Sequence, residues 1–132
     1  GDRPVKAPAK PRKREEKTLL LLHCGECFAL RQRPKKGLLA GMWELPSLEG
    51  SCSREEVEGW LQEQGAQVRS LETLPESKHI FTHVEWHMRA FGAELAEPLP
   101  GFFWADPQSL EETCALPSAF KAYFPLLGLQ KS

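Results

Sequence analysis

Three histidines recur at every fourth residue of the segment HIFTHVEWHMRAF, at His79, His83 and His87. On a helix, this spacing would align the three imidazoles on one stripe, as in the His-x-x-x-His pattern of zinc proteases. The segment also alternates apolar and polar residues with a period of two, which is typical of a half-buried strand. Residues four apart on a strand are separated by roughly 13 Å, whereas zinc needs its ligands at about 2 Å. The pattern therefore predicts a strand over 79–91 with a polar, histidine-bearing face and no metal site.

The charge of the chain is distributed unevenly. The net charge of the 132 residues is −1, but residues 1–17 carry +4 and the remainder carries −5. The first segment is rich in proline, lysine and arginine and lacks the apolar centre of a signal peptide. We interpret 1–17 as a basic interdomain linker and 18–132 as one folded domain. The abrupt start suggests a piece of a longer chain, and a basic arm can attract phosphate or simply be solvated.

Cysteine spacing suggests half of a zinc site, but no second pair completes it. Cys24 and Cys27 flank Gly25-Glu26, which lies between two apolar runs and predicts a hairpin turn. Free thiols in a reducing compartment are the favoured interpretation of the four cysteines. No run of apolar residues reaches the length of a membrane helix.

The expected elements alternate several strands with two helices. Strands are predicted at 18–23, 27–33, 42–46, 67–74, 79–91 (extending to 95) and 101–107. Ser53 and Glu56 have the form of a capping box, and Gly65 ends the helix that follows. A second helix is expected over 116–129. This order predicts an α+β fold in which a sheet is sandwiched between helices.

The segment GMWELP (41–46), after a strand and a basic loop, resembles the start of the Nudix core of MutT-type nucleotide pyrophosphohydrolases. In that family a helix with the sequence Arg-Glu-x-x-Glu-Glu-x-Gly follows. Aligned on Gly65, this chain has Glu58 for the arginine, Gly59 for the first glutamate and only Glu63 of the glutamate pair. Hydrolysis of a pyrophosphate needs Mg²⁺ held by several carboxylates. The resemblance therefore implies a Nudix-like mixed sheet between helices, with no catalytic residues and no metal ligands.

A Nudix-like domain without its catalytic box resembles the C-terminal domain of MutY-type adenine DNA glycosylases, especially the bacterial branch. RQRPKKGLLAGMWELP (31–46) and HIFTHVEWH (79–87) are the two segments that carry the resemblance. That family has an N-terminal helical domain, with an iron–sulfur cluster of the 4Fe-4S type, that removes adenine. Its C-terminal domain recognises 8-oxoguanine opposite the adenine, through a Phe-Ser-His loop that corresponds to Phe81, Thr82 and His83. The resemblance therefore implies that the strand alternation fails locally around 81–83.

The chemistry of this loop fits a damaged base. In 8-oxoguanine N7 carries a proton, so the hydroxyl of Thr82 can accept a hydrogen bond that guanine cannot donate. Phe81 offers a wedge or stacking surface, and His83 can meet a phosphate. A basic patch can contact the DNA backbone or only water, and it consists of Arg31, Arg33, Lys35 and Lys36.

The resemblance also implies partners and a location. We expect a monomeric domain that needs no cofactor of its own, binds double-stranded DNA with 8-oxoguanine opposite adenine, and contacts the glycosylase domain of the same chain. A bacterial, cytoplasmic and nucleoid-associated repair protein would result.

Two alternatives stay open. One is an active Nudix hydrolase that cleaves oxidised nucleotides. The other is a protein-interaction module that uses an aromatic-rich surface, formed by Phe102, Phe103, Trp104, Phe120, Tyr123 and Phe124.

Overall fold

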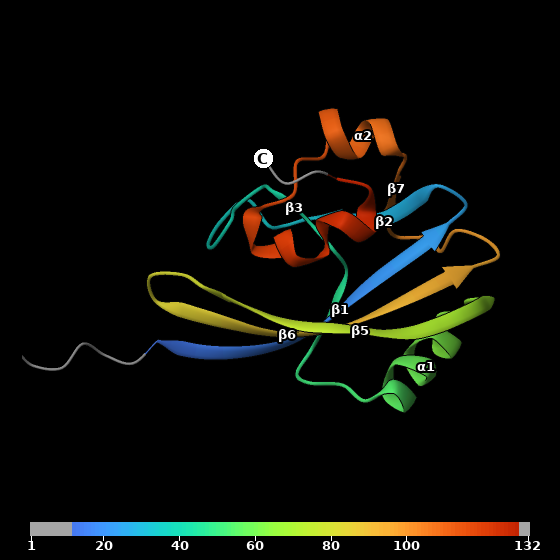
Figure 1. Ribbon diagram of the computed structural model, residues 1–132, viewed down its shortest axis with the longest axis horizontal. Helices are drawn as coiled ribbons and strands as arrows, with labels where there is room; N and C mark the ends of the chain where they lie inside the picture. The colour runs from blue at the N-terminus through green and yellow to red at the C-terminus, as the bar shows by residue number, and fades with distance from the viewer. Residues whose placement is uncertain (1–11, 130–132) are drawn as a thin grey trace, which may run out of the picture.

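The leucine run Leu19–Leu22 lies at the centre of the fold. Alternate side chains of a strand point to opposite faces of its sheet, and all four of these leucines are buried. The computed structural model describes residues 12–129, in which helical segments cover both faces of one mixed sheet (Figure 1). A strand buried on both faces explains why this run is continuously apolar.

The strands follow the chain in the order β1 (Lys13–Cys24), β2 (Cys27–Gln32), β3 (Trp43–Glu44), β4 (Ser47–Glu49), β5 (Val68–Ile80), β6 (Val84–Leu95) and β7 (Phe103–Ala105). The helical segments are α1 (Arg54–Glu63), α2 (Pro107–Glu112) and the 3₁₀ helix η1 (Ser118–Leu127). The sheet order is β3-β2-β1-β6-β5, with β4 paired to β1 and β7 paired to β2. Among these described strands, only the β1–β6 pair is parallel. The predicted α+β sheet between helices is confirmed.

The two faces of the sheet bury separate cores. On one face, Leu20, Leu22 and Phe91 pack with Val57 and Leu61 of α1. On the other face, the buried side chains come from the sheet, α2 and η1, and include Leu19, Leu21, Leu30, Trp86, Met88, Leu110, Phe120 and Tyr123. The predicted capping box of α1 is present, because Ser53 accepts from the N–H of Glu56 and the Glu56 carboxylate accepts from the N–H of Ser53.

Strand β1 begins five residues earlier than predicted, at Lys13. Lys13–Lys17, which the sequence analysis placed in the linker, pair in register with Val84–Met88 of β6. This pairing is non-local, so the local composition of the segment could not indicate it. Residues 1–11 of the predicted linker lie outside the described residues.

The strand predicted over 79–91 is wrong, because the segment belongs to two antiparallel strands. β5 ends at Ile80 and β6 begins at Val84. The apolar positions Ile80 and Val84 continue the period of two across the loop between them, which is why the sequence resembles one strand. The strand predicted over 67–74 continues to Ile80, past Pro75 and an irregularity in register between Leu74 and Ser77.

The C-terminal segment also differs from its prediction. The helix expected there is the 3₁₀ helix η1, which contains Pro125. Proline has no N–H to donate within a helix, and its ring disrupts the α-helical hydrogen bonds of the preceding turn. β4 and α2 were not predicted, although Asp106 caps α2 and Pro107 occupies its first turn, both of which are N-terminal helix signals.

Candidate nucleic-acid interface

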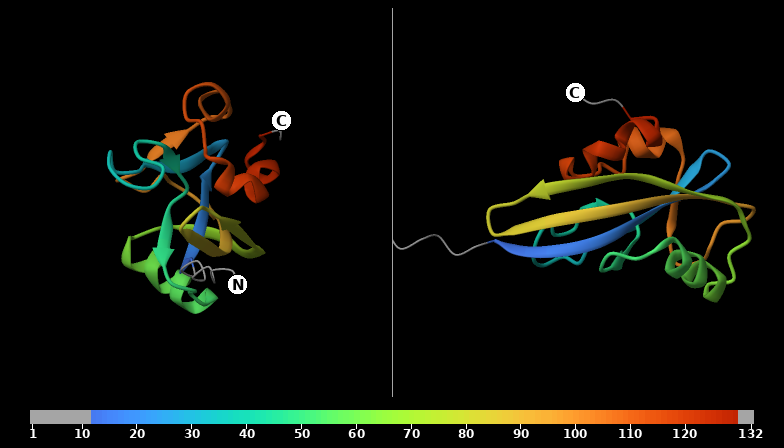
Figure 2. Two further views of the ribbon diagram at one scale, coloured as in Figure 1. Left: turned by 90° about the vertical axis from the view of Figure 1, so that its left-hand side faces the viewer. Right: turned by 60° about the horizontal axis from the view of Figure 1, so that its bottom comes forward.

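A three-residue loop, Phe81–His83, joins the two longest neighbouring strands of the sheet. The N–H of Phe81 donates to the carbonyl of Val84 over 2.8 Å and closes the hairpin. The hairpin tip lies at the end of the molecule where β1 starts, far from α1 (Figures 1 and 2). The expected local failure of the alternation at 81–83 is therefore confirmed.

The three loop residues differ in exposure. Thr82 and His83 are exposed, while Phe81 is half-buried against the core. The Phe81 ring meets Trp86 nearly edge-on, with centroids 4.9 Å apart, and meets His79 at 4.7 Å in the same manner. Aromatic pairs in this geometry stabilise beyond their buried area. Phe81 therefore anchors the loop, and Thr82 and His83 present a hydroxyl and an imidazole to solvent.

The start of β1 holds the same loop from the other side. The N–H of Lys13 donates to the carbonyl of His83 over 3.0 Å. The Nε of Arg12 donates to the carbonyl of Phe81, also over 3.0 Å. Two of the three loop carbonyls are thus bound by residues about seventy positions earlier in the sequence.

The three histidines belong to β5, the loop and β6, and each has different surroundings. His79 meets Phe81 edge-on, His83 is exposed, and His87 lies 3.1 Å from the Glu85 carboxylate. Within residues 12–129, no group of three or more His, Cys, Asp or Glu side chains is placed to hold a metal ion.

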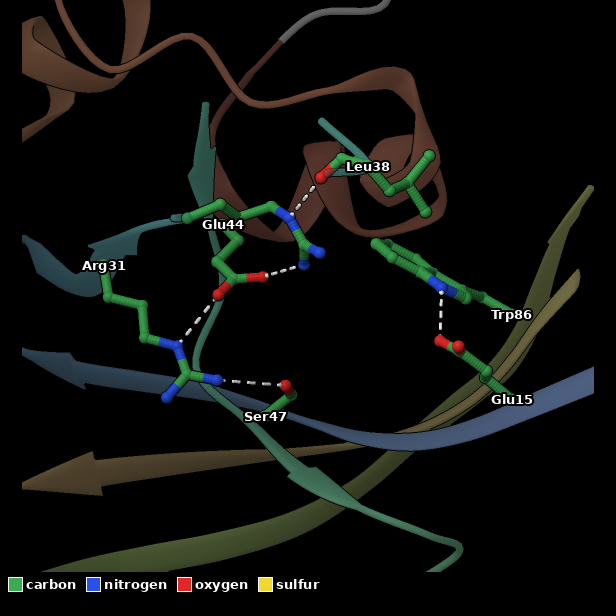
Figure 3. A network of polar contacts seen from close by, with 7 residues as sticks. Glu15, Arg31, Leu38, Glu44, Ser47 and Trp86 are labelled. Carbon is green, nitrogen blue, oxygen red and sulfur yellow. Dashed lines mark hydrogen bonds and ion pairs between the residues drawn. The ribbon is translucent and has the colours of Figure 1, made fainter. Parts of the chain in front are cut away.

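Trp86 is a buried hub below the loop. Its indole Nε1 donates to Glu15 over 3.2 Å, as Figure 3 shows. The Nζ of Lys17 lies 4.7 Å from the centre of the Trp86 ring and the guanidinium carbon of Arg33 lies 5.4 Å from it. Cations at these distances are attracted to the ring face. Glu15 and Lys17 of β1, and Arg33 directly after β2, thus surround the tryptophan that Phe81 contacts.

Arg31 and Arg33 of the predicted basic patch are engaged within the domain. Both bind the buried Glu44 carboxylate, Arg31 Nε at 3.0 Å and Arg33 Nη1 at 2.8 Å. Arg31 also donates to Ser47 Oγ at 3.4 Å (Figure 3), and Arg33 Nε donates to the Leu38 carbonyl at 2.9 Å. The structure therefore gives these two arginines an internal role, which the sequence analysis missed.

The two lysines of the patch have a different environment. Lys35 and Lys36 are exposed in the loop 33–42 between β2 and β3. Neither forms a hydrogen bond or an ion pair with another residue in the part of the chain that the structure describes. They remain the patch cations that are available to an anionic partner.

The positions that match the Nudix catalytic box lie on α1. Glu58 is 3.8 Å from Arg54 in an ion pair along the helix, and Gly59 carries no side chain. Glu56 is used in the capping box. Glu63 is exposed at the end of α1.

The cysteines and the aromatic-rich segment have structural surroundings. Cys24 and Cys27 are opposite each other across the predicted turn, and all four cysteines are free thiols.

Phe120 and Tyr123 are buried in the core. Phe103 is 45% exposed and packs on Trp43 at 5.3 Å. Of the six aromatic residues of the interaction-module alternative, Phe102, Trp104 and Phe124 are partly buried and only Phe103 is exposed. No helix within residues 12–129 has the length and apolar character needed to cross a membrane.

Sequence reasoning missed Arg12, Glu15, Lys17 and Glu44 as supports of the loop. Their contacts join segments that are 13 to 71 residues apart.

Comparison with known proteins identifies relatives over nearly the whole chain. Residues 17–125 match the NUDIX domain family. The adenine DNA glycosylase of Schizosaccharomyces pombe is 26% identical, over 94% of this chain and 32% of its own length. The human adenine DNA glycosylase is 30% identical, over 92% of this chain and 25% of its own length. This chain thus spans about a third or less of these relatives.

Solved structures show the same fold. The C-terminal domain of mouse MUTYH, in a complex with human PCNA, superposes with a TM-score of 0.63 at 22% identity, over 89% of this chain and 92% of that one. The MutT protein of Methanosarcina mazei gives 0.60 at 15% identity, over 91% and 96%. The Nudix-like fold expected from the sequence is confirmed.

Proposed function

The chain belongs to the NUDIX domain family, and we propose that it is the lesion-recognition domain of an adenine DNA glycosylase in base excision repair. Its similarity to adenine DNA glycosylases from yeast and human supports this assignment. We further propose that the domain recognises 8-oxoguanine opposite adenine in duplex DNA. The observation that carries this proposal is the exposed Thr82-His83 pair at the tip of the β5–β6 hairpin. Arg12 and Lys13 bind two backbone carbonyls of this loop, and the Phe81 ring packs against Trp86.

The exposed side chains suit the altered base. The Thr82 hydroxyl can accept a hydrogen bond from N7–H of 8-oxoguanine, whereas N7 of guanine offers only an acceptor. The same hydroxyl can also donate to guanine N7, so in this proposal the preference depends on how the loop orients Thr82 against the base. His83 can donate to a neighbouring phosphate. Phe81 is half-buried, so it supplies anchoring and presents only part of its ring to a base.

The basic residues divide between structure and binding. In this proposal Lys35 and Lys36 contact the phosphate backbone, which supplies affinity without sequence information. Arg31 and Arg33 serve the lesion loop indirectly, through Glu44 and Trp86.

The excision chemistry belongs in this proposal to a glycosylase domain outside these 132 residues, together with its expected 4Fe-4S cluster. Within residues 12–129, no three His, Cys, Asp or Glu side chains are grouped to hold a metal ion, which is consistent with a cluster in that other domain. This domain is therefore proposed to be non-catalytic and to act next to that domain on the same DNA, as a monomer at the bacterial nucleoid. The contribution of the domain is selection of the base pair.

The test uses the full-length protein and two duplexes that differ only in the base opposite adenine. We expect release of adenine opposite both 8-oxoguanine and guanine, with a clear preference for the first. A protein that releases no adenine from either duplex would contradict the glycosylase assignment. Equal rates on both duplexes would contradict lesion recognition.

A further inference from the structure

Arg12 contacts the lesion loop although it lies 69 residues away in the sequence. Its Nε donates to the Phe81 carbonyl over 3.0 Å, and its Nη1 lies 3.7 Å from the Glu85 carboxylate. One guanidinium therefore bridges the first residue of the loop and the second residue of β6. The side chain reaches this position because the adjacent Lys13 pairs with Val84.

The loop depends on such contacts because it has little other support. Of its three residues, only Phe81 packs against the core. A hydrogen bond from a charged donor is roughly twice as strong as one between neutral groups. The carbonyls on both sides of Thr82 are bound, that of Phe81 by Arg12 and that of His83 by the N–H of Lys13. The peptide unit that precedes Thr82 is thus held by Arg12, and the one that follows His83 is held by Lys13.

The Glu85 carboxylate keeps the Arg12 guanidinium in place. His87 lies 3.1 Å from Glu85 on the side away from the loop. The hydrogen bond with His87 lowers the pKa of Glu85, and the charges of His87, Lys78 and Arg12 lower it further against the opposing effect of desolvation. Glu85 is therefore ionised at neutral pH, as an ion pair with Arg12 requires.

We propose that Arg12 is a positioning residue for lesion selectivity, a role that rests on the proposed function of the loop. It touches neither base nor phosphate in this role. It fixes the Phe81 carbonyl, and through it the orientation of Thr82 and His83. Arg12 directly precedes β1, so this contact joins the start of β1 to the lesion loop.

Arg14 provides a matched control within the same strand. It lies two residues further on, carries the same charge and is exposed. In the described part of the chain it makes neither a hydrogen bond nor an ion pair, and it pairs in register with Glu85 only through the backbone. Arg14→Ala therefore removes one positive charge from this region without releasing the loop.

The experiment compares Arg12→Ala, Arg12→Lys and Arg14→Ala in the full-length protein. Hydrogen–deuterium exchange of the peptide containing 81–84 reports loop order without DNA. Single-turnover adenine release opposite 8-oxoguanine and opposite guanine, at fixed salt, gives the lesion preference. Arg12→Ala should accelerate exchange and reduce the preference by roughly two- to tenfold, the effect of losing one hydrogen bond. Arg12→Lys should retain most of both, and Arg14→Ala should lower the two rates equally with unchanged exchange.

Wild-type exchange and wild-type preference in Arg12→Ala would overturn the inference, and so would faster exchange with an unchanged preference. A variant with alanine at 82 and 83 separates this failure from failure of the proposed function. If that variant loses the preference while Arg12→Ala keeps it, only the role of Arg12 is wrong. If that variant also keeps the preference, the loop is not the lesion reader.

Discussion

Glu44 Oε1 lies 2.8 Å from Arg33 Nη1, and this ion pair holds the Arg33 guanidinium over the Trp86 ring. Arg33 was predicted from the sequence to bind DNA. Replacing Glu44 with alanine leaves Arg33 and Arg31 without their carboxylate. Since only 9% of the Glu44 side chain is exposed, we expect the free energy of unfolding to fall on the order of 3 kcal/mol. Urea denaturation measures the change. Glu49→Ala, which removes an exposed carboxylate from β4, the next strand along the chain, should have little effect. An equal loss in both variants would contradict this role of Glu44.

Tyr123 connects η1 to β5 through two hydrogen bonds. Its hydroxyl donates to the Pro75 carbonyl over 2.8 Å and lies 2.9 Å from Ser77 Oγ, which donates to it. Tyr123→Phe leaves both partners without this hydroxyl, and we expect a loss of about 1–3 kcal/mol in the free energy of unfolding. Ser77→Ala removes only one of the two bonds and should cost less. A Tyr123→Phe variant as stable as the wild type would show that water replaces the hydroxyl.

Tyr123 also predicts a pH dependence at the alkaline end. Burial raises the pKa of Tyr123, the Ser77 hydrogen bond opposes this effect, and the charge of Glu76 adds to it. A raised pKa in the folded state means that the contribution to stability is complete below the ordinary value of 10.0 and is lost as the pH rises through the folded-state pKa. Unfolding measured from pH 8 to 11 should show this loss in the wild type. The loss should be smaller in Tyr123→Phe, in which the Cys114 thiol, whose pKa is also raised by burial, still contributes. An equal alkaline loss in both proteins would assign it to other groups.

Much of the fold could be predicted from local sequence, and the wrong predictions of strand bounds have a common cause. The buried leucine run, the hairpin turn at Gly25-Glu26 and the capping box at Ser53 each depend on neighbouring residues, and all three predictions are confirmed. The extent of β1 and the division between β5 and β6 depend on which distant strand pairs with which. Composition and periodicity do not carry that information.

The candidate site shows the same division. The position of Phe81–His83 in a loop followed from resemblance to a known family, since the alternation alone predicts an unbroken strand. The roles of Arg12 and Glu44 arise from contacts across 69 and 13 residues. Charge identifies such residues as basic or acidic, but only their partners show whether they bind DNA or the domain itself.

The domain is expected to hydrolyse no nucleotide. Gly59 supplies no carboxylate, Glu58 is paired with Arg54, and hydrolysis of a pyrophosphate needs several ligands for Mg²⁺. Incubation with dGTP or 8-oxo-dGTP and Mg²⁺ should release no pyrophosphate above background. Turnover that is lost in Glu63→Gln would instead support the hydrolase alternative.

Lys35 and Lys36 are predicted to contribute affinity without selectivity. Alanine at both positions in the full-length protein should weaken binding to all duplexes about equally. The slope of log affinity against log salt should decrease by roughly one unit for each phosphate that the variant no longer neutralises. Arg69→Ala is the control for a general loss of charge, because Arg69 lies near the start of β5, at the opposite end from the lesion loop. An unchanged slope after the double replacement would place the loop away from DNA.

The central claim is that the exposed residues of the hairpin loop read the lesion. In the full-length protein, Thr82→Ala alone should remove at most one hydrogen bond, which is worth about 0.5–1.5 kcal/mol. Alanine at all three positions 81–83 should reduce the preference for 8-oxoguanine over guanine more than Thr82→Ala does. Alanine at 82 and 83 alone retains the half-buried Phe81 and guards against misfolding. Thr73→Ala, which changes an exposed threonine within β5, is the matched control.

The most direct measurement is the ratio of single-turnover adenine release opposite 8-oxoguanine to that opposite guanine, at fixed salt, for the wild type and these variants. If the loop reads the lesion, the variants at 81–83 slow the first reaction and spare the second, because the proposal assigns extrusion of the adenine to another domain. The ratio then falls, while Thr73→Ala leaves it unchanged. If both reactions slow equally, or neither slows, the loop does not read 8-oxoguanine.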